Sequence, residues 1–170
     1  MPPRAAAADA RQWVAVSTPV ERPYAVIDID GVLADTSHRM HFLERGRKNW
    51  NAFFAAAPQD PPLPEGVEVA QTLARDHDVA YVTGRPSRYR SDTLSWLDGH
   101  GLPPGLLIMR AAGDRRPAEL TKLAAIRRLA AARPVAVVVD DDQDVCAAAR
   151  QAGFNVFEAT WAAREPDSAD

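Results

Sequence analysis

Short apolar runs recur along the chain, and each ends at polar or small residues. The first run covers residues 24–29 and stops at Asp30-Gly31, which is the pattern of a buried strand that ends in a tight loop. Runs of the same form cover residues 79–82, 106–109, 135–139 and 155–157. The pattern therefore predicts five short strands.

Stretches typical of helices separate these strands. They cover residues 65–76, 87–99, 117–132 and 143–152, and Pro86 and Pro117 suit a first helical turn. Because strands and helices alternate along the chain, we expect a parallel sheet with helices on both faces. The predicted fold class is therefore α/β.

Residues 36–64 interrupt this alternation. Trp50, Phe53 and Phe54 stand there at helical spacing, and a proline-rich stretch at 58–64 follows them. We interpret the segment as a small helical insert after the first strand. Its aromatic side chains either pack the insert onto the body of the domain or form a lip that faces the substrate.

Length and composition indicate one globular domain. The chain has 170 residues, of which 46% are hydrophobic and 25% charged, and these are ordinary values for a folded domain. We place the domain at residues 23–163, with tails at 1–22 and 164–170. No apolar run reaches the roughly 18 residues of a membrane-spanning helix, and residues 1–10 lack the apolar segment of a secretory signal. The cytoplasm is therefore the expected location.

Charge and cysteine content limit the classes of partner and cofactor. The formal net charge is −3, so no global positive field would hold a long duplex, and any contact with nucleic acid must be local. Cys146 is the only cysteine, which excludes an internal disulfide and a cysteine-rich zinc site. We expect Cys146 to be a small buried side chain rather than a nucleophile.

Polar residues that follow the predicted strands carry the candidate chemistry. In open parallel sheets, ligands bind beyond the carboxyl ends of the strands. Lys122 lies on the helix between the third and fourth strands. The residues at the strand ends are Asp28, Asp30, Thr83, Gly84, Arg85, Arg110, Asp140 and Asp141.

Four carboxylates, those of Asp28, Asp30, Asp140 and Asp141, are expected to gather at this edge. Their mutual repulsion would raise their pKa values and destabilise the fold, so the arrangement requires a divalent cation, with Mg²⁺ as the candidate. A carboxylate nucleophile, a second acid, a hydroxyl, a lysine and a metal together suit phosphoryl transfer. We predict a phosphate-ester substrate and an aspartyl-phosphate intermediate on Asp28.

Four elements of the sequence resemble, in order, the four motifs of the haloacid dehalogenase (HAD) superfamily of phosphatases: AVIDIDGVLADT, YVTGR, Lys122 and VVVDDD. The resemblance implies a Rossmann-like, three-layer fold with Asp28 as the nucleophile. Asp30 would protonate the leaving group and then activate water, while Thr83 and Lys122 would bind the phosphoryl group. Mg²⁺ would be held by Asp28, the carbonyl of Asp30, and the pair Asp140 and Asp141.

A narrower resemblance covers residues 24 to about 160. The chain is similar to the phosphatase domain of polynucleotide kinase-phosphatases, and MRAAGDRRPAELTK is the best local match. The chain departs from that family at Ala118, where the family has an acidic residue, and Glu119 is a neighbouring substitute. The resemblance implies substrate-binding or phosphate-binding roles for Arg39, Thr83, Gly84, Arg85, Arg110, Arg116 and Lys122.

The kinase half of such enzymes has no counterpart in these residues. No segment matches GxxxxGK[ST], the loop that cradles the phosphates of a nucleotide in P-loop kinases. A kinase or ligase that acts with this chain in nucleic-acid repair would then be a separate partner.

Six arginines after the second and third strands are expected to form a rim that binds a polyanion: Arg85, Arg88, Arg90, Arg110, Arg115 and Arg116. His38 and His41 lie near the expected entrance. The favoured substrate is therefore a nucleotide or the 3'-phosphate end of a polynucleotide. A phosphatase of mononucleotides or small metabolites is the alternative, followed by an inactive binding relative or a receiver-like module, whose motifs occur in a different order.

Overall fold

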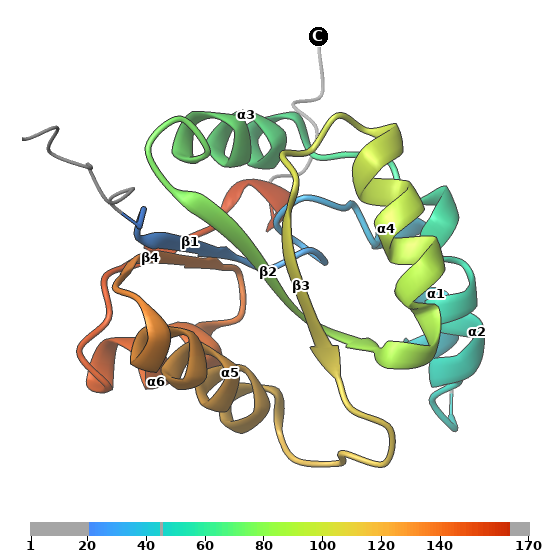
Figure 1. Cartoon of the computed structure of the whole chain (residues 1–170). Helices are drawn as coiled ribbons and strands as arrows, with labels where there is room; N and C mark the ends of the chain where they lie inside the picture. The colour runs from blue at the N-terminus through green and yellow to red at the C-terminus, as the bar shows by residue number, and fades with distance from the viewer. Residues whose placement is uncertain (1–20, 45, 164–170) are drawn as a thin grey trace, which may run out of the picture.

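The computed structural model describes residues 21–44 and 46–163 (Figure 1). The expected tail 164–170, and all but the last two residues of the expected tail 1–22, lie outside the described residues. The strands are β1 (Tyr24–Ile27), β2 (Asp78–Pro86), β3 (Gly105–Arg110), β4 (Val135–Asp140) and β5 (Val156–Glu158). They form one parallel sheet in the order β3-β2-β1-β4-β5. The predicted α/β, Rossmann-like class is confirmed.

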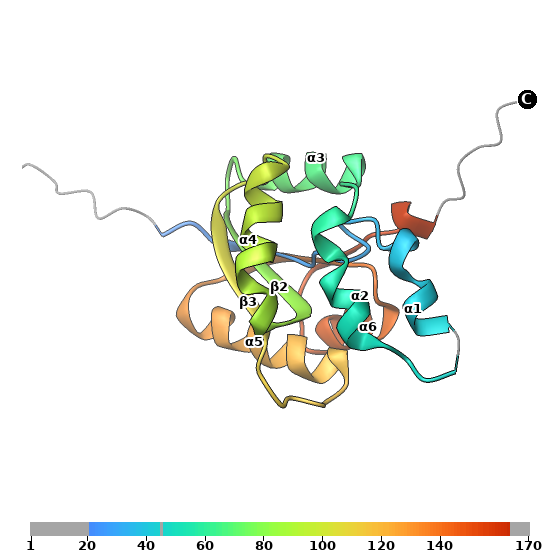
Figure 2. The same ribbon diagram turned by 90° about the vertical axis from the view of Figure 1, so that its right-hand side faces the viewer.

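Helices cover both faces of the sheet. The helix α3 (Pro64–Leu73) and α4 (Arg90–Gly99) lie over one face, and α5 (Ala118–Ala132) and α6 (Gln143–Gln151) lie over the other (Figures 1 and 2). These are the helices that the sequence predicted, with ends that differ by a few residues. No helix in residues 21–44 and 46–163 is both long enough and apolar enough to cross a membrane.

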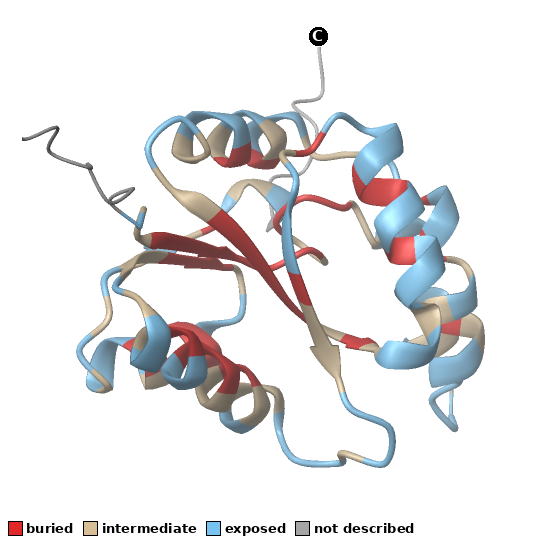
Figure 3. Ribbon diagram, viewed as in Figure 1, coloured by how far each residue is buried: buried red, intermediate tan, exposed pale blue. Residues whose placement is uncertain are grey.

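Side chains alternate between the two faces along the central strand β1. Tyr24 and Val26 pack with Ile126 and Leu129 of α5, whereas Ile27 packs on the side of α3 and α4. Figure 3 shows the central strands and the inward faces of the helices as buried. Because helices cover both faces of the sheet, the strands are continuous apolar runs in the sequence. Each fully buried aliphatic side chain stabilises the fold by about 1.5–3 kcal/mol.

Strand β2 is longer than predicted. The prediction ended this strand before Thr83, but β2 continues to Pro86, which pairs with Arg110 of β3. The pairing is irregular between Thr83 and Pro86. The prediction was wrong because the apolar pattern stops at Thr83, where buried polar side chains replace the apolar ones, while the backbone goes on pairing with β3. Pro86 therefore ends β2 and is also the N-cap residue of the short 3-10 helix Ser87–Tyr89 that leads into α4.

The predicted insert contains two short helices, α1 (His41–Glu44) and α2 (Trp50–Ala55). Helix α2 lies next to α4, and α1 lies on the other side of α2 (Figure 2). Phe53 is buried under the guanidinium of Arg39, 4.1 Å from its ring centre. The ring of Phe54 lies 6.0 Å from that of Tyr89 at the start of the α4 segment. Phe54 thus packs the insert onto the body, Phe53 is buried within the insert against Arg39, and Trp50 is exposed.

The chain changes direction across the sheet at β1. Strands β2 and β3 lie to one side of β1, and β4 and β5 lie to the other. In open α/β sheets, the ligand crevice lies at the carboxyl ends of the strands on either side of such a switch point. Asp28 follows β1 and Asp140 ends β4, so both residues stand at the switch point.

Candidate active site

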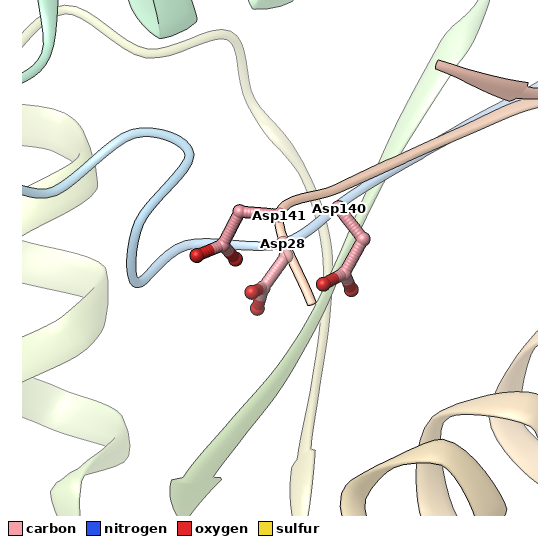
Figure 4. A group of neighbouring side chains, drawn as sticks. All are labelled: Asp28, Asp140 and Asp141. Carbon is pink, nitrogen blue, oxygen red and sulfur yellow. The ribbon is translucent and has the colours of Figure 1, made fainter. Parts of the chain in front are cut away.

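Three aspartates meet beyond the carboxyl ends of β1 and β4 (Figure 4). The backbone N–H of Asp28 donates to the carbonyl of Val139 at 2.9 Å, so strand pairing fixes this residue. Asp140 is the last residue of β4, and Asp141 follows it. One carboxylate oxygen from each aspartate lies within 4.8 Å of the other two. We call Asp28, Asp140 and Asp141 the acidic cluster.

Two neighbouring residues shape the loops around the acidic cluster. Gly31 has a φ of +78°, a conformation that favours glycine, and a Cβ at this position would overlap the carboxylate of Asp141. The side chain of Asp142 accepts hydrogen bonds from the N–H groups of Asp144 and Val145 and caps α6. The three consecutive aspartates at 140–142 therefore divide into two cluster residues and one helix cap.

Lys122 is the cation that faces the acidic cluster. It is buried near the start of α5, with its Nζ 2.9 Å from Asp28 Oδ2 and 2.7 Å from Asp140 Oδ2. Burial disfavours the charged ammonium, but Asp28 and Asp140 outweigh burial and hold the pKa of Lys122 above its ordinary value. Lys122 is therefore protonated at neutral pH.

The acidic cluster holds more negative charge than Lys122 balances. Burial raises the pKa of Asp28 well above its ordinary value, and Asp140 and Asp141 add to that effect while Lys122 opposes it. Burial and the charge of Asp140 raise the pKa of Asp141 to about 6. An excess of closely spaced carboxylate oxygens fits a hard divalent cation such as Mg²⁺. The residues present therefore suit the predicted metal.

Of the four carboxylates expected at this edge, Asp30 is the one that lies outside the acidic cluster and pairs with two arginines. Its Oδ1 accepts hydrogen bonds from Arg39 Nη2 at 2.8 Å, from Arg85 Nε at 2.9 Å and from Arg85 Nη2 at 2.6 Å. Burial disfavours ionisation, but Arg85 and Arg39 outweigh it and lower the pKa of Asp30. The carboxylate turns toward these guanidiniums because they stabilise its charge, which the acidic cluster would repel.

Arg39 and Arg85 are buried, and both also reach Asp60. Their exposed fractions are 0% and 1%. Arg39 donates from Nε to Asp60 Oδ1 and from Nη2 to Asp60 Oδ2, both at 2.7 Å, and Arg85 Nη2 lies 3.0 Å from Asp60 Oδ2. Two carboxylates thus hold Arg85 inside the domain, apart from the other arginines of the expected rim. We call Asp30, Arg39, Asp60 and Arg85 the arginine network.

Asp60 is a site residue that the sequence analysis missed. It lies in the proline-rich stretch before α3, where a charged residue reads as part of an exposed turn, yet its side chain is fully buried. Its Oδ1 also lies 2.8 Å from Nε2 of His38, so this histidine contacts the arginine network. No spacing rule links position 60 to Arg39 or Arg85. The sequence pattern therefore carried no signal for Asp60.

A groove of about 110 Å³ lies between α5 and the ends of β2 and β3. Thr83 and Lys122 line the groove, and Lys122 also contacts Asp28 of the acidic cluster. Arg128 was not identified from the sequence, although it stands seven residues after Thr121 and so on the same face of α5. The charged and polar residues that line this α5 groove are Thr83, Arg110, Asp114, Arg116, Thr121, Lys122 and Arg128.

Internal contacts order the loop between β3 and α5. Arg110 Nη1 donates to the carbonyl of Arg116 at 2.8 Å, and Arg116 Nη2 donates to Asp114 Oδ2 at 2.7 Å. Hydrogen bonds from Arg116 lower the pKa of Asp114 to about 2. The two predicted arginines of this loop therefore line the α5 groove in a defined arrangement.

The other predicted site positions lie outside the α5 groove. Arg88 Nη2 donates to Asn51 Oδ1 at 2.6 Å, and Arg90 Nη1 donates to the carbonyl of Leu107 at 2.9 Å. Gly84 lies on β2 between Thr83 and Arg85, and a Cβ there would meet open space. Of the six arginines of the expected rim, Arg85 lies in the arginine network, Arg110 and Arg116 line the α5 groove, Arg88 and Arg90 contact the insert and β3, and Arg115 is exposed.

Comparison with known protein families matches residues 23–162 to the polynucleotide kinase PNKP phosphatase domain. The chain belongs to this family. The PNKP phosphatase domain family is of the HAD type, so the chain is a HAD phosphatase, as the four motifs indicated. A comparison with curated proteins found no match.

Solved structures share the fold of this PNKP-type phosphatase domain. A chain of the Pnkp1/Rnl/Hen1 RNA repair complex superposes with a TM-score of 0.68 at 23% identity, over 81% of this chain and 42% of that one. This chain thus spans less than half of that protein. A HAD-like hydrolase from Streptococcus pneumoniae gives 0.56 at 14% identity, over 82% and 85% of the two chains. The HAD hydrolase YfnB from Bacillus subtilis, bound to magnesium, gives 0.55 at 10% identity, over 80% and 87%.

Proposed function

We propose that this chain is a Mg²⁺-dependent phosphomonoesterase that removes the 3'-phosphate from polynucleotide ends through an aspartyl-phosphate on Asp28. The observation that carries the proposal is the position of the acidic cluster and Lys122 at the switch point of the sheet. Lys122 lies there at hydrogen-bonding distance from Asp28. Nucleophile, counter-charge and metal ligands stand together there.

In the first step, a carboxylate oxygen of Asp28 attacks phosphorus, and the bond from phosphorus to the ester oxygen breaks. Protonated Asp30 gives its proton to that oxygen, so the leaving group departs as an alcohol. The two arginines lower the pKa of Asp30 in the free chain. The negative charge of the bound phosphoryl group opposes that effect and favours the protonated acid.

In the second step, water attacks the phosphorus of the aspartyl-phosphate. Asp30 accepts a proton from this water, the bond from phosphorus to Asp28 breaks, and inorganic phosphate leaves. The proton that Asp30 gave in the first step is thereby restored. Both steps use Asp28 and Asp30 in complementary roles.

Charge on the transferring phosphoryl group is stabilised by fixed donors. The ammonium of Lys122 and the hydroxyl of Thr83 line the same groove and are suited to donate to its oxygens. Asp28, the carbonyl of Asp30, Asp140 and Asp141 would hold Mg²⁺, which would supply positive charge against the same oxygens.

The α5 groove supports a polynucleotide as the substrate. Arg110, Arg116 and Arg128 line it, and guanidiniums match the geometry of phosphate oxygens. The likeness to a chain of an RNA repair complex supports the same substrate class. A kinase or a ligase that acts on the same ends would be a separate partner of this chain.

Phosphate release from a matched panel of substrates tests the proposal. The panel contains a 3'-phosphorylated oligonucleotide, its 5'-phosphorylated counterpart, 3'- and 5'-mononucleotides and sugar phosphates, each with and without Mg²⁺. We expect the 3'-phosphorylated oligonucleotide to have the highest kcat/KM. A higher value for mononucleotides or sugar phosphates would overturn the polynucleotide substrate, and no Mg²⁺-dependent release from any ester would overturn the enzyme itself.

A pair of adjacent arginines tests the α5 groove. Arg128 lines it, whereas Arg127 is exposed and does not. We expect Arg128→Ala to raise KM for the 3'-phosphorylated oligonucleotide about tenfold, equivalent to about 1.4 kcal/mol, with kcat little changed. Arg127→Ala should leave both constants unchanged. Equal effects of the two substitutions would mean that only the overall charge of α5 matters.

A further inference from the structure

Asp60 is the anchor of the arginine network. Its two carboxylate oxygens accept hydrogen bonds from Arg39 Nε and Nη2 and from Arg85 Nη2, at 2.7–3.0 Å. The side chains of Asp60, Arg39 and Arg85 are at most 2% exposed. Water therefore cannot replace these contacts, and charge-assisted hydrogen bonds of this length are the strong ones.

The backbone and surroundings of Asp60 are fixed as firmly as its carboxylate. Trp96 Nε1, on α4, donates to the carbonyl of Asp60 at 2.9 Å. The N–H of Asp60 donates to the carbonyl of Ala57 at 3.1 Å. Asp60 thus joins the insert to α4, and through Arg85 it joins both to β2.

The arginine network treats the two oxygens of Asp30 differently. All three hydrogen bonds from Arg39 and Arg85 end at Oδ1. Among the described residues, no hydrogen bond ends at Oδ2, and the side chain of Asp30 is 23% exposed. Since three N–H groups hold one oxygen, rotation of the carboxylate is restricted, and Oδ2 is the oxygen left for substrate.

The hydrogen bonds to Asp60 explain why both guanidiniums donate only to Oδ1 of Asp30 and not to its Oδ2. Arg39 and Arg85 each divide their N–H groups between the two aspartates. Without the charge of Asp60, each guanidinium would be free to take both oxygens of Asp30 in the bidentate geometry that arginine prefers with carboxylates. Oδ2 would then be withdrawn from the leaving group.

We propose that Asp60 is a positioning residue, which holds Arg39 and Arg85 so that Asp30 presents Oδ2 to the leaving oxygen of the substrate. Asp60 touches no substrate atom in this role and acts only through the two arginines. The inference rests on the proposed function, because it assigns the general-acid step to Asp30.

The test compares two esters that differ in their need for a general acid. The leaving oxygen of p-nitrophenyl phosphate departs without a proton, whereas the sugar oxygen of a 3'-phosphorylated oligonucleotide needs one. General-acid catalysis contributes at least about a hundredfold. We expect Asp60→Asn to lower kcat for the oligonucleotide about a hundredfold and kcat for p-nitrophenyl phosphate only a few-fold. KM for the oligonucleotide should change little.

The ratio of the two kcat values is the deciding readout, since it does not depend on the fraction of folded enzyme. Asp78→Asn is the matched control, because it breaks another Asp–Arg pair, Arg133 Nη1 to Asp78 Oδ2 at 2.7 Å, at the opposite end of the sheet. This control should leave the ratio unchanged. If Asp60→Asn does not fold, Arg85→Lys should change the ratio in the same direction. This substitution keeps the positive charge but loses the planar guanidinium that donates to two carboxylates at once.

Failure of the inference and failure of the proposed function give different results. Equal losses on both esters in Asp60→Asn would make Asp60 a purely structural residue and overturn the inference. Absence of Mg²⁺-dependent hydrolysis of either ester by the unaltered chain would overturn the proposed function instead.

Discussion

The acidic cluster and the arginine network begin two residues apart on the chain, yet they balance charge in opposite ways. In the acidic cluster, three carboxylates face the single ammonium of Lys122, and the pKa of Asp28 is raised by burial and by its neighbours. In the arginine network, two carboxylates face two guanidiniums, which outweigh burial and lower the pKa of Asp30. The charges of the network balance within this chain, whereas the cluster keeps an excess of negative charge.

This difference separates two tasks within one site. A group that is electrically complete can hold a side chain in one orientation. A group with excess negative charge is less stable alone and gains stability when a cation binds. Substitutions in the acidic cluster should therefore cost mainly activity, whereas substitutions in the arginine network should also lower the stability of the fold.

The largest effect is expected in the acidic cluster, on activity. Asp28→Asn removes the nucleophile, and kcat should fall by about 10⁴-fold or more, while the fold remains because Lys122 keeps its contact with Asp140. Phosphate release with Mg²⁺ and a circular dichroism spectrum measure the two quantities. Appreciable Mg²⁺-dependent turnover by the variant would contradict the assignment of Asp28.

The next effect is expected in the arginine network, on stability. Asp60→Ala leaves two buried guanidiniums with one carboxylate, and breaking a buried ion pair from one side costs about 3–5 kcal/mol. The free energy of unfolding in urea should fall by this amount. Asp28→Asn, measured in the same way without Mg²⁺, should lose far less. Equal losses would remove the distinction between the two groups.

The smallest effect is expected from the metal itself. Mg²⁺ at a hundred times its dissociation constant should stabilise the chain by about 2.7 kcal/mol, which raises Tm by roughly 5–10 °C for a domain of this size. Asp141→Asn should reduce this shift, and without Mg²⁺ it should be no less stable than the unaltered chain, because it relieves repulsion in the cluster. If Tm does not change when Mg²⁺ is added, the acidic cluster does not bind the metal.

Most of the fold was predictable because buried parallel strands read as continuous apolar runs. The strand ends were less predictable, and β2 shows why: its last residues carry side chains for the site while their backbone still pairs with β3. The meeting of Asp28 and Asp140 was predictable because parallel strands bring their carboxyl ends to one edge. The place of Lys122 beside them, on a helix, was implied by the resemblance to the HAD motifs.

The arginine network was not predictable from the sequence. Arginine is usually exposed, and an aspartate among prolines reads as a surface turn. Arg39, Asp60 and Arg85 become buried only because each balances another, and those partners are far apart along the chain. Local patterns report propensity and periodicity, whereas this network depends on pairing that the tertiary structure alone creates.

The junction of β1 and β4 also sets when the site can form. The contact of Asp28 with Val139 joins an early part of the described chain to a late one. Closing such a long loop costs entropy before any contact rewards it, and strand pairings between distant segments are intrinsically slow. Refolding chains should therefore recover helical signal before metal binding or turnover, so that the active centre marks completed folding rather than an early folding intermediate.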